Sequence, residues 1–374
     1  DIHGFDPDKA SGWHGAEYDK GTNSLKNFTG SKVTYIYECS SGYSTSFTIL
    51  TGTIYESDIL TIDENAFPDD TFRKYISDNF DTDKSGGLSR SEINAVKTID
   101  VSGTYEKPGT VKSLKGIEVF TLLTNLSCNY NELTDIDVSQ NHSLVCLNIV
   151  NNKLTKLDVS QNTSLSSLYF SGNNVSEIDL SNNLDIGWLA LVGNPISKLD
   201  LSSQKYLYEV SFAHCRLTSL DLSNCQSTPY IYSDYNRYVI NTDGTSFPLS
   251  KLPEGFDPSK ASDWNGAEYD SSTNTLKNIT SGIITYNYDC GKGLTFKCSL
   301  INESAPSYTV TFDEKIWAFS DNFGYYISSG ETSPSGSVIY VNIALQDYID
   351  HKVMLNGEEI TLSPTDSGYM YSYK

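Results

Sequence analysis

One 21-residue period runs through the middle of the chain and limits its fold more than any other feature. Six apolar residues mark it, each 21 positions after the previous one: Leu126, Leu147, Leu168, Leu189, Val210 and Ile231. Two positions after each lie Cys128, Ile149, Phe170, Leu191, Phe212 and Ser233. Alternate side chains of a strand point to one face, so this spacing predicts short parallel strands stacked side by side.

A polar column follows each expected strand. Its members are Asn131, Asn152, Asn173, Asn194, Cys215 and Asn236, each followed two positions later by an apolar or aromatic residue. The resulting pattern, L-x-L-x-x-N/C-x-L, is typical of leucine-rich repeats, which stack into a solenoid. A second column comprises Asn141, Asn162, Asn183, Gln204 and Cys225. We expect both columns to form hydrogen-bonded ladders, with a cysteine thiol able to fill an asparagine position.

A second repetition is independent of the solenoid. Residues 4–39 recur as residues 255–290, and 23 of the 36 aligned positions are identical. Conserved turn residues and aromatic runs predict a small β module in both places. The second copy follows the last repeat, so we expect it to cover the open end of the solenoid. The first copy suggests an upstream repeat array before residue 1.

An acidic segment, residues 81–92, has the spacing of a calcium-binding EF-hand loop. The expected ligands are the side chains of Asp81, Asp83, Ser85, Ser89 and Glu92 and the carbonyl oxygen of Gly87. Apolar residues at Phe72, Ile76 and Phe80 predict an entering helix. The alternative is that Ser89 and Glu92 only form a capping box at the next helix; both can hold together. We expect a lone, structural Ca²⁺ site in a helical cap.

The sequence therefore predicts an α/β leucine-rich repeat solenoid of 21-residue repeats with an EF-hand-like helical cap and flanking all-β modules. Alternating residues after position 306 favour a terminal Ig-like β domain. The expected units are a β module (1–60), the helical cap (61–100), the repeats (101–253), the second β module (254–305) and the Ig-like domain (306–374).

Composition excludes several function classes. The net charge of −21 repels nucleic-acid phosphates and anionic lipid, and no apolar stretch is long enough for membrane insertion. Seven cysteines without a C-x-x-C pair predict reduced, structural thiols. The chain has none of the common catalytic motifs, and we predict that it is not an enzyme. A repeated aspartate (Asp137, Asp158, Asp179, Asp200 and Asp221) is interpreted as a turn acceptor that faces solvent rather than as an acidic site.

The combination of an EF-hand-like cap, the segment Ser113–Glu118 and the repeats resembles the leucine-rich repeat surface proteins of gut anaerobic bacteria. More distantly, it resembles the internalins. This resemblance implies an exported, extracellular or cell-surface adhesin or protein-binding module, whose partner could be a host extracellular protein.

The concave face of the sheet is the expected contact surface, because residues between the inward positions point there. The candidate ligand-binding residues are Val150, Tyr169, Trp188, Val192, Tyr230 and Tyr232. Alternatively, the rings only cover small neighbours such as Ala190, or the β modules fold over them. For the whole chain, a glycan-binding module and a structural spacer stay open beside protein binding.

Overall fold

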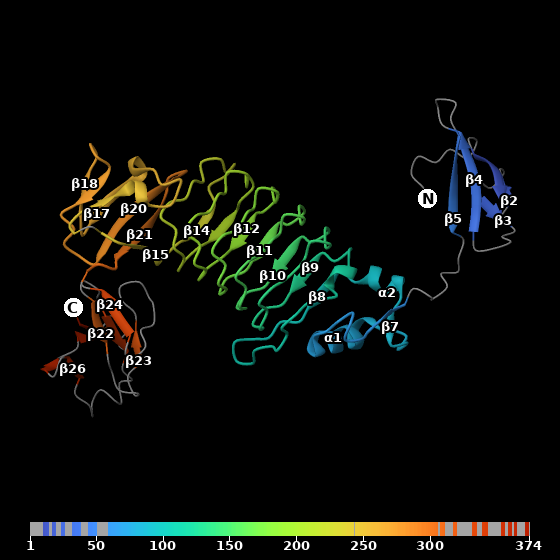
Figure 1. Cartoon of the computed structure of the whole chain (residues 1–374), viewed down its shortest axis with the longest axis horizontal. Helices are drawn as coiled ribbons and strands as arrows, with labels where there is room; N and C mark the ends of the chain where they lie inside the picture. The colour runs from blue at the N-terminus through green and yellow to red at the C-terminus, as the bar shows by residue number, and fades with distance from the viewer. Residues whose placement is uncertain are drawn as a thin grey trace.

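The computed structural model describes residues 59–242 and 244–305 in full, and outside these ranges mainly the backbones of individual strands. Its centre is a seven-stranded sheet of parallel strands, each paired with the next along the chain (Figure 1). The strands are β8 (Thr98–Asp100), β9 (Asn125–Ser127), β10 (Cys146–Asn148), β11 (Ser167–Tyr169), β12 (Trp188–Ala190), β13 (Glu209–Ser211) and β14 (Tyr230–Tyr232). Leu147 pairs with Leu126 on one side and with Leu168 on the other, so equivalent repeat positions are adjacent.

The inward residues of the strands form one continuous core. The first apolar column is buried from Leu126 to Val210, and the second from Cys128 to Phe212. Burying an apolar side chain of this size contributes roughly 1.5–3 kcal/mol, so the columns dominate the stability of the stack. Ile231 in the last strand is half-buried and marks the end of the repeats. The leucine-rich repeat fold predicted from the sequence is confirmed.

The chain leaves each strand through a residue in the left-handed backbone region. The φ angle is positive at Tyr130 (52°), Asn151 (54°), Gly172 (67°), Gly193 (71°), His214 (54°) and Tyr235 (63°), each directly before a ladder residue. Residues other than glycine adopt this backbone conformation only at a cost in conformational free energy. Backbone hydrogen bonds to the next repeat hold it, as from the Tyr130 N–H to the Val150 carbonyl (2.8 Å).

The first asparagine ladder joins successive repeats. Asn152 donates from Nδ2 to the carbonyl of Cys128 in the preceding repeat (2.7 Å), and its Oδ1 accepts from the Leu133 N–H (3.0 Å). Cys215 fills the same position: its Sγ lies 3.3 Å from the Leu191 carbonyl. The ladder therefore satisfies backbone groups that the turn would otherwise leave buried without partners.

The second ladder lies on the return side. Asn183, fully buried, donates from Nδ2 to the carbonyls of Val159 and Asn162, both at 2.9 Å. Cys225 ends the column with its Sγ 3.8 Å from the Gln204 carbonyl. Each member reaches back by one repeat, so this ladder also ties neighbouring turns of the solenoid together.

A segment with two short α-helices covers the first repeat. It comprises β6 (Leu60–Thr61), α1 (Asp70–Phe80), β7 (Gly87–Leu88), α2 (Arg90–Ala95) and, after β8, the 3₁₀ helix η3 (Ile117–Val119). Phe72 and Ile76 of α1 are fully buried, and Phe80 packs against Phe120 with ring centroids 5.8 Å apart. The apolar stripe expected on the entering helix thus faces the solenoid.

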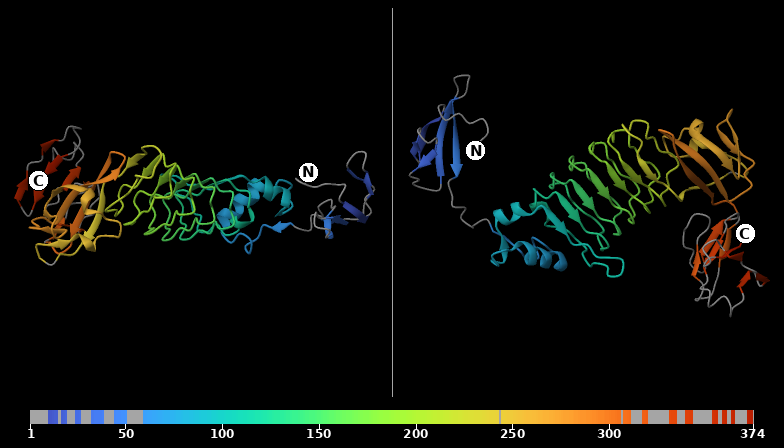
Figure 2. Two further views of the ribbon diagram at one scale, coloured as in Figure 1. Left: turned by 90° about the horizontal axis from the view of Figure 1, so that it is seen from above. Right: turned by 180° about the vertical axis from the view of Figure 1, so that it is seen from behind.

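The second β module covers the other end. Its main strands are β17 (Ala261–Asn265), β20 (Ile283–Gly291) and β21 (Leu294–Asn302), and β21 pairs in parallel with β15 (Asn236–Ile240), which lies in the segment before the module. Its smaller elements are η5 (Pro258–Lys260), β18 (Glu268–Asp270) and β19 (Thr275–Lys277). β19 also pairs with β16 (Phe247–Pro248), which precedes the module and is followed by η4 (Leu249–Lys251). In Figure 2 the green repeat strands continue directly into the yellow and orange strands of this module. Phe296 meets Phe212 edge-to-face at 5.2 Å, and the Tyr286 hydroxyl donates to the Thr218 carbonyl (2.7 Å). These contacts join the module to the solenoid core.

The duplicated segments share one backbone pattern. The first copy contains β1 (Ala10–His14), β2 (Glu17–Asp19), β3 (Ser24–Lys26), β4 (Lys32–Glu38) and β5 (Ser44–Leu50). Ala10 pairs with Tyr37 as Ala261 pairs with Tyr288, and both pairs of strands carry the same irregularity after the second residue. Repetition of the sequence therefore extends to strand register.

After residue 306 the described backbone consists of antiparallel pairs. The strands are β22 (Ser307–Val310), β23 (Trp317–Phe319), β24 (Glu331–Pro334), β25 (Ile339–Asn342), β26 (Val353–Leu355), β27 (Glu358–Ile360), β28 (Ser363–Pro364) and β29 (Tyr371–Tyr373). The order β23-β25-β29-β28 makes one sheet. Its side chains lie outside the described residues, and the Ig-like assignment stays a prediction.

Every helix in the described part of the chain is too short or too polar to cross a membrane.

Candidate functional site

The acidic segment forms a tight loop between α1 and α2. Lys84 and Gly86 have φ angles of 59° and 85°, and the turn is closed by the Ser85 N–H, which donates to carboxylate oxygens of Asp81 (3.0 Å) and Asp83 (2.9 Å). The strand of the loop, β7, pairs antiparallel with β6. The loop strand is thus paired with a strand that precedes α1 in the chain.

Three carboxylates converge in this loop. Oxygen atoms of Asp81, Asp83 and Glu92 lie within 4.8 Å of one another, with Asp81 buried and Asp83 exposed. The Ser85 hydroxyl is 3.2 Å from the Gly87 carbonyl oxygen and donates to it. Hard oxygen donors of this kind suit Ca²⁺. The predicted ligand types are thus in one loop, and the structure brings its three carboxylates together.

Glu92 is held by hydrogen bonds from both sides of the loop. The Thr82 hydroxyl donates to its Oε1 at 2.6 Å, and the Ser89 N–H donates to its Oε2 at 2.9 Å. The Thr82 hydroxyl, more than any other group, lowers the pKa of Glu92 to about 2, so the carboxylate is ionised at neutral pH. The Ser89 hydroxyl also accepts from the Glu92 N–H, which completes a capping box at α2. The capping box therefore shares Glu92 with the carboxylate cluster and Ser89 with the predicted ligand set.

The aromatic residues predicted on the concave face differ in exposure. Trp188, Tyr230 and Tyr232 are 43%, 59% and 58% exposed, so neither neighbours nor the second β module bury them. Tyr169, Val150 and Val192 are half-buried, and Tyr169 lies beside Ala190 in the register. The exposed part of the predicted surface thus lies toward the last strands of the sheet.

Three rings make a continuous row across β12, β13 and β14. The Tyr208 ring centroid lies 5.7 Å from that of Trp188 and 5.4 Å from that of Tyr230, with interplanar angles of 52° and 67°. Sequence reasoning missed Tyr208, which is 49% exposed, because it stands one position before the strand column and Glu209 occupies the column itself. A second tyrosine two positions earlier, Tyr206, is the sequence signal that could have drawn attention to this repeat; it is 59% exposed.

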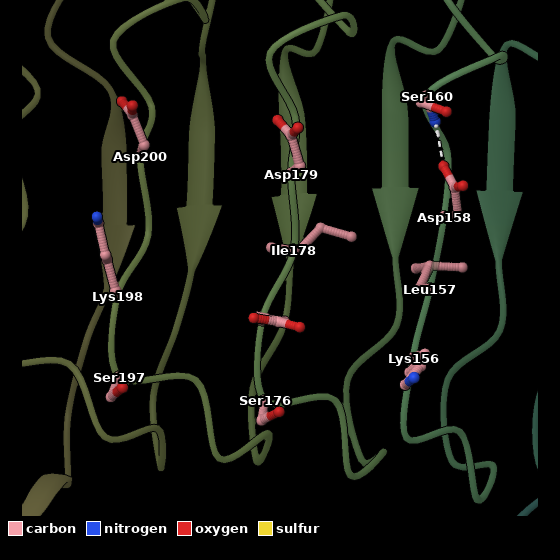
Figure 3. Close-up of a pocket in the computed structure, with 11 residues that line it drawn as sticks. Lys156, Leu157, Asp158, Ser160, Ser176, Ile178, Asp179, Ser197, Lys198 and Asp200 are labelled. Carbon is pink, nitrogen blue, oxygen red and sulfur yellow. Dashed lines mark hydrogen bonds between the residues drawn. The ribbon is translucent and has the colours of Figure 1, made fainter.

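The repeated aspartates line a shallow hollow on the return side (Figure 3). Its volume is about 740 Å³, and its lining includes Asp158, Asp179 and Asp200. Each carboxylate accepts from the N–H of the serine two positions later at 2.9 Å, as Asp158 does from Ser160. Hydrogen bonds from the Ser160 hydroxyl and N–H lower the pKa of Asp158. These bonds agree with the turn-acceptor interpretation.

The described cysteines are free and mostly buried: Cys128, Cys146, Cys215, Cys225, Cys290 and Cys298. Burial raises the pKa of Cys128 and of Cys215 to about 12, so these thiols stay protonated and unreactive. Cys39 lies outside the residues whose side chains are described.

A parallel sheet with one strand per repeat and asparagine ladders on both sides defines the chain as a leucine-rich repeat protein. It is distantly internalin-like, as the sequence predicted: it is 31% identical over 75 residues to internalin J of Listeria monocytogenes serotype 4b (strain F2365). That match covers 20% of this chain and 8% of internalin J. No protein-family profile matches the chain.

Solved structures of similar proteins include two further internalins of Listeria monocytogenes strain 4b F2365. InlF shares 22% identity at a TM-score of 0.39, with 50% of this chain and 62% of that chain covered. InlC2 shares 16% identity at a TM-score of 0.35, with 53% of this chain and 95% of that chain covered.

Proposed function

We propose that this chain is a non-catalytic protein-binding or adhesion protein of a bacterial cell surface, and that its concave face contacts the partner. The row formed by Trp188, Tyr208 and Tyr230 carries this proposal. Large aromatic side chains left in water by a well-packed protein are typical anchors of interfaces. The similarity to internalin J supports a binding role and an extracellular location.

The test applies the full chain to an array of purified extracellular proteins and to a glycan array. Any bound component is then measured against the double variant Trp188→Ala with Tyr230→Ala. Because anchor residues contribute about 2 kcal/mol or more, we expect the double variant to lose at least about tenfold in affinity while its melting temperature stays unchanged. Tyr105→Ala, which removes a 79% exposed ring outside the sheet, is the matched control.

If the double variant binds as well as the parent, the concave-face assignment is wrong and the terminal β domain becomes the better candidate. Binding on the glycan array alone would favour the second candidate, a glycan-binding module. The observation that favours this candidate is the same row of exposed rings, since aromatic faces also stack on sugars. If the chain binds nothing on either array, a structural spacer is favoured.

We also propose that the loop at residues 81–92 binds one Ca²⁺ with a structural role. The supporting observations are the clustered oxygens of Asp81, Asp83 and Glu92 and the nearby Gly87 carbonyl. Ca²⁺ would offset two of the three negative charges of these carboxylates and hold α1 and α2 in a fixed relation against the first repeat.

A further inference from the structure

The strands of the parallel sheet carry acidic side chains and no basic ones. The seven strands contain no lysine or arginine, whereas Glu209 lies in β13 and the exposed Asp234 follows β14 by two residues. Glu209 pairs in register with Trp188 on one side and with Tyr230 on the other, so its half-buried side chain emerges between the strands that carry these rings. Lys205 lies on the turn before β13 and Arg237 lies on β15, so neither belongs to the parallel sheet. A carboxylate within a row of rings favours a positively charged partner group.

The geometry of the three rings also favours a positively charged partner group. The planes turn by 52° between Trp188 and Tyr208 and by 67° between Tyr208 and Tyr230. Three rings inclined in this way share no common plane, so they favour a compact group over an extended sugar chain. They do present π faces in several directions, and a compact cation is attracted to such a face over a range of approaches. Arginine gains most, because its planar guanidinium stacks on the ring and can also donate to a carboxylate.

We infer that the row Trp188–Tyr208–Tyr230, with Glu209 in its middle, receives an arginine or lysine side chain of a basic protein partner. This inference rests on the proposed function of the concave face and names the chemistry of the partner. The cation lies against a ring face, and Glu209 supplies its counter-charge.

The probe is a hexa-arginine peptide, compared with a peptide of the same length in which citrulline, neutral and nearly isosteric, replaces arginine. Binding to the full chain is measured calorimetrically at about 0.15 M salt, where long-range attraction is screened. We expect the citrulline peptide to bind at least about tenfold more weakly. Trp188→Ala with Tyr208→Ala, which leaves the net charge unchanged, should weaken hexa-arginine binding about tenfold.

Glu209→Gln should weaken the same binding about threefold or more. The matched control is Asp179→Asn, which removes one negative charge from the return side and should change binding less than about twofold. Equal binding of the citrulline peptide would overturn the inference. Unchanged binding by the ring variant would also overturn it, because attraction would then reflect only the net charge of −21.

The arrays separate failure of this inference from failure of the proposed function. If an array partner depends on Trp188 and Tyr230 while hexa-arginine does not, the inference is wrong and the concave face still binds. If neither depends on the rings, both are wrong.

Discussion

Single residues in this protein act through the repeat next to their own. Asn152 accepts from Leu133 and donates to Cys128, so one amide completes buried hydrogen bonds of the preceding repeat. A buried N–H or carbonyl left without a partner costs about 1–3 kcal/mol. Asparagine at a ladder position is therefore a stability determinant, although its chemistry resembles that of any surface asparagine.

We expect Asn152→Ala to lower the free energy of unfolding by about 3 kcal/mol, because the Leu133 N–H and the Cys128 carbonyl both lose a partner. The measurement is urea unfolding followed by circular dichroism. Asn182→Ala is the control: Asn182 is exposed, its one bond is 3.4 Å long, and its loss should change stability by less than about 0.5 kcal/mol. Equal losses in both variants would contradict the ladder role.

The return-side aspartates make stability depend on acid. Hydrogen bonds from Ser160 lower the pKa of Asp158 in the folded state, whereas the unfolded value is about 3.9. The stabilisation is therefore complete above about pH 5 and is lost as the pH falls through the folded pKa. Asp158→Asn keeps an acceptor oxygen but does not titrate. Its unfolding free energy should decline less than that of the parent between about pH 5 and pH 2; parallel curves would refute this.

At the scale of elements, the acidic loop depends on a strand outside it. β7 pairs with β6, so Leu60 and Thr61 hold the loop strand. The ligand cluster therefore stands on a paired strand and between α1 and α2, which is why ion binding should stabilise the whole cap.

We expect Ca²⁺ to raise the melting temperature, because an ion bound only by the folded loop stabilises by mass action, about 2.7 kcal/mol at about 100 times Kd. Differential scanning fluorimetry with millimolar Ca²⁺ or with EGTA measures the shift. Asp81→Asn and Glu92→Gln should abolish it, whereas Asp78→Asn, on α1 beside Lys74, should retain it. Identical melting in Ca²⁺ and EGTA would rule out the site.

At the scale of the whole molecule, the solenoid is open at both ends and depends on what covers them. Each repeat contacts mainly its neighbours, so stability is a sum of local interfaces. The last interface is with the second β module, where Phe296 and Tyr286 contact Phe212 and Thr218. Without this module, the core of the last repeat would lie in water.

Phe296→Ala should lower the free energy of unfolding by about 3–5 kcal/mol, because it leaves a cavity between module and repeats. Amide hydrogen exchange of the full chain should then be faster than in the parent, both in the module and in the repeat that contains Phe212. Phe296→Leu, which fills more of the space, should cost less. Faster exchange confined to the module would show that the module does not stabilise the repeats.

Sequence alone determined the solenoid, its inward columns and the ladder positions, because a 21-residue period places equivalent residues side by side whatever lies between them. It also located the acidic loop, since the proposed ligands are spaced within 12 consecutive residues. Features that depend only on the spacing of residues along the chain can be predicted from the sequence alone.

Only the tertiary structure decided which residues meet across repeats. Tyr208 contacts both Trp188 and Tyr230 although it stands one position before their column. The pairing of β6 with β7 and the left-handed turn at Tyr130 likewise have no sequence signature. These features depend on contacts between segments distant in the chain, and such contacts exist only once the repeats have stacked.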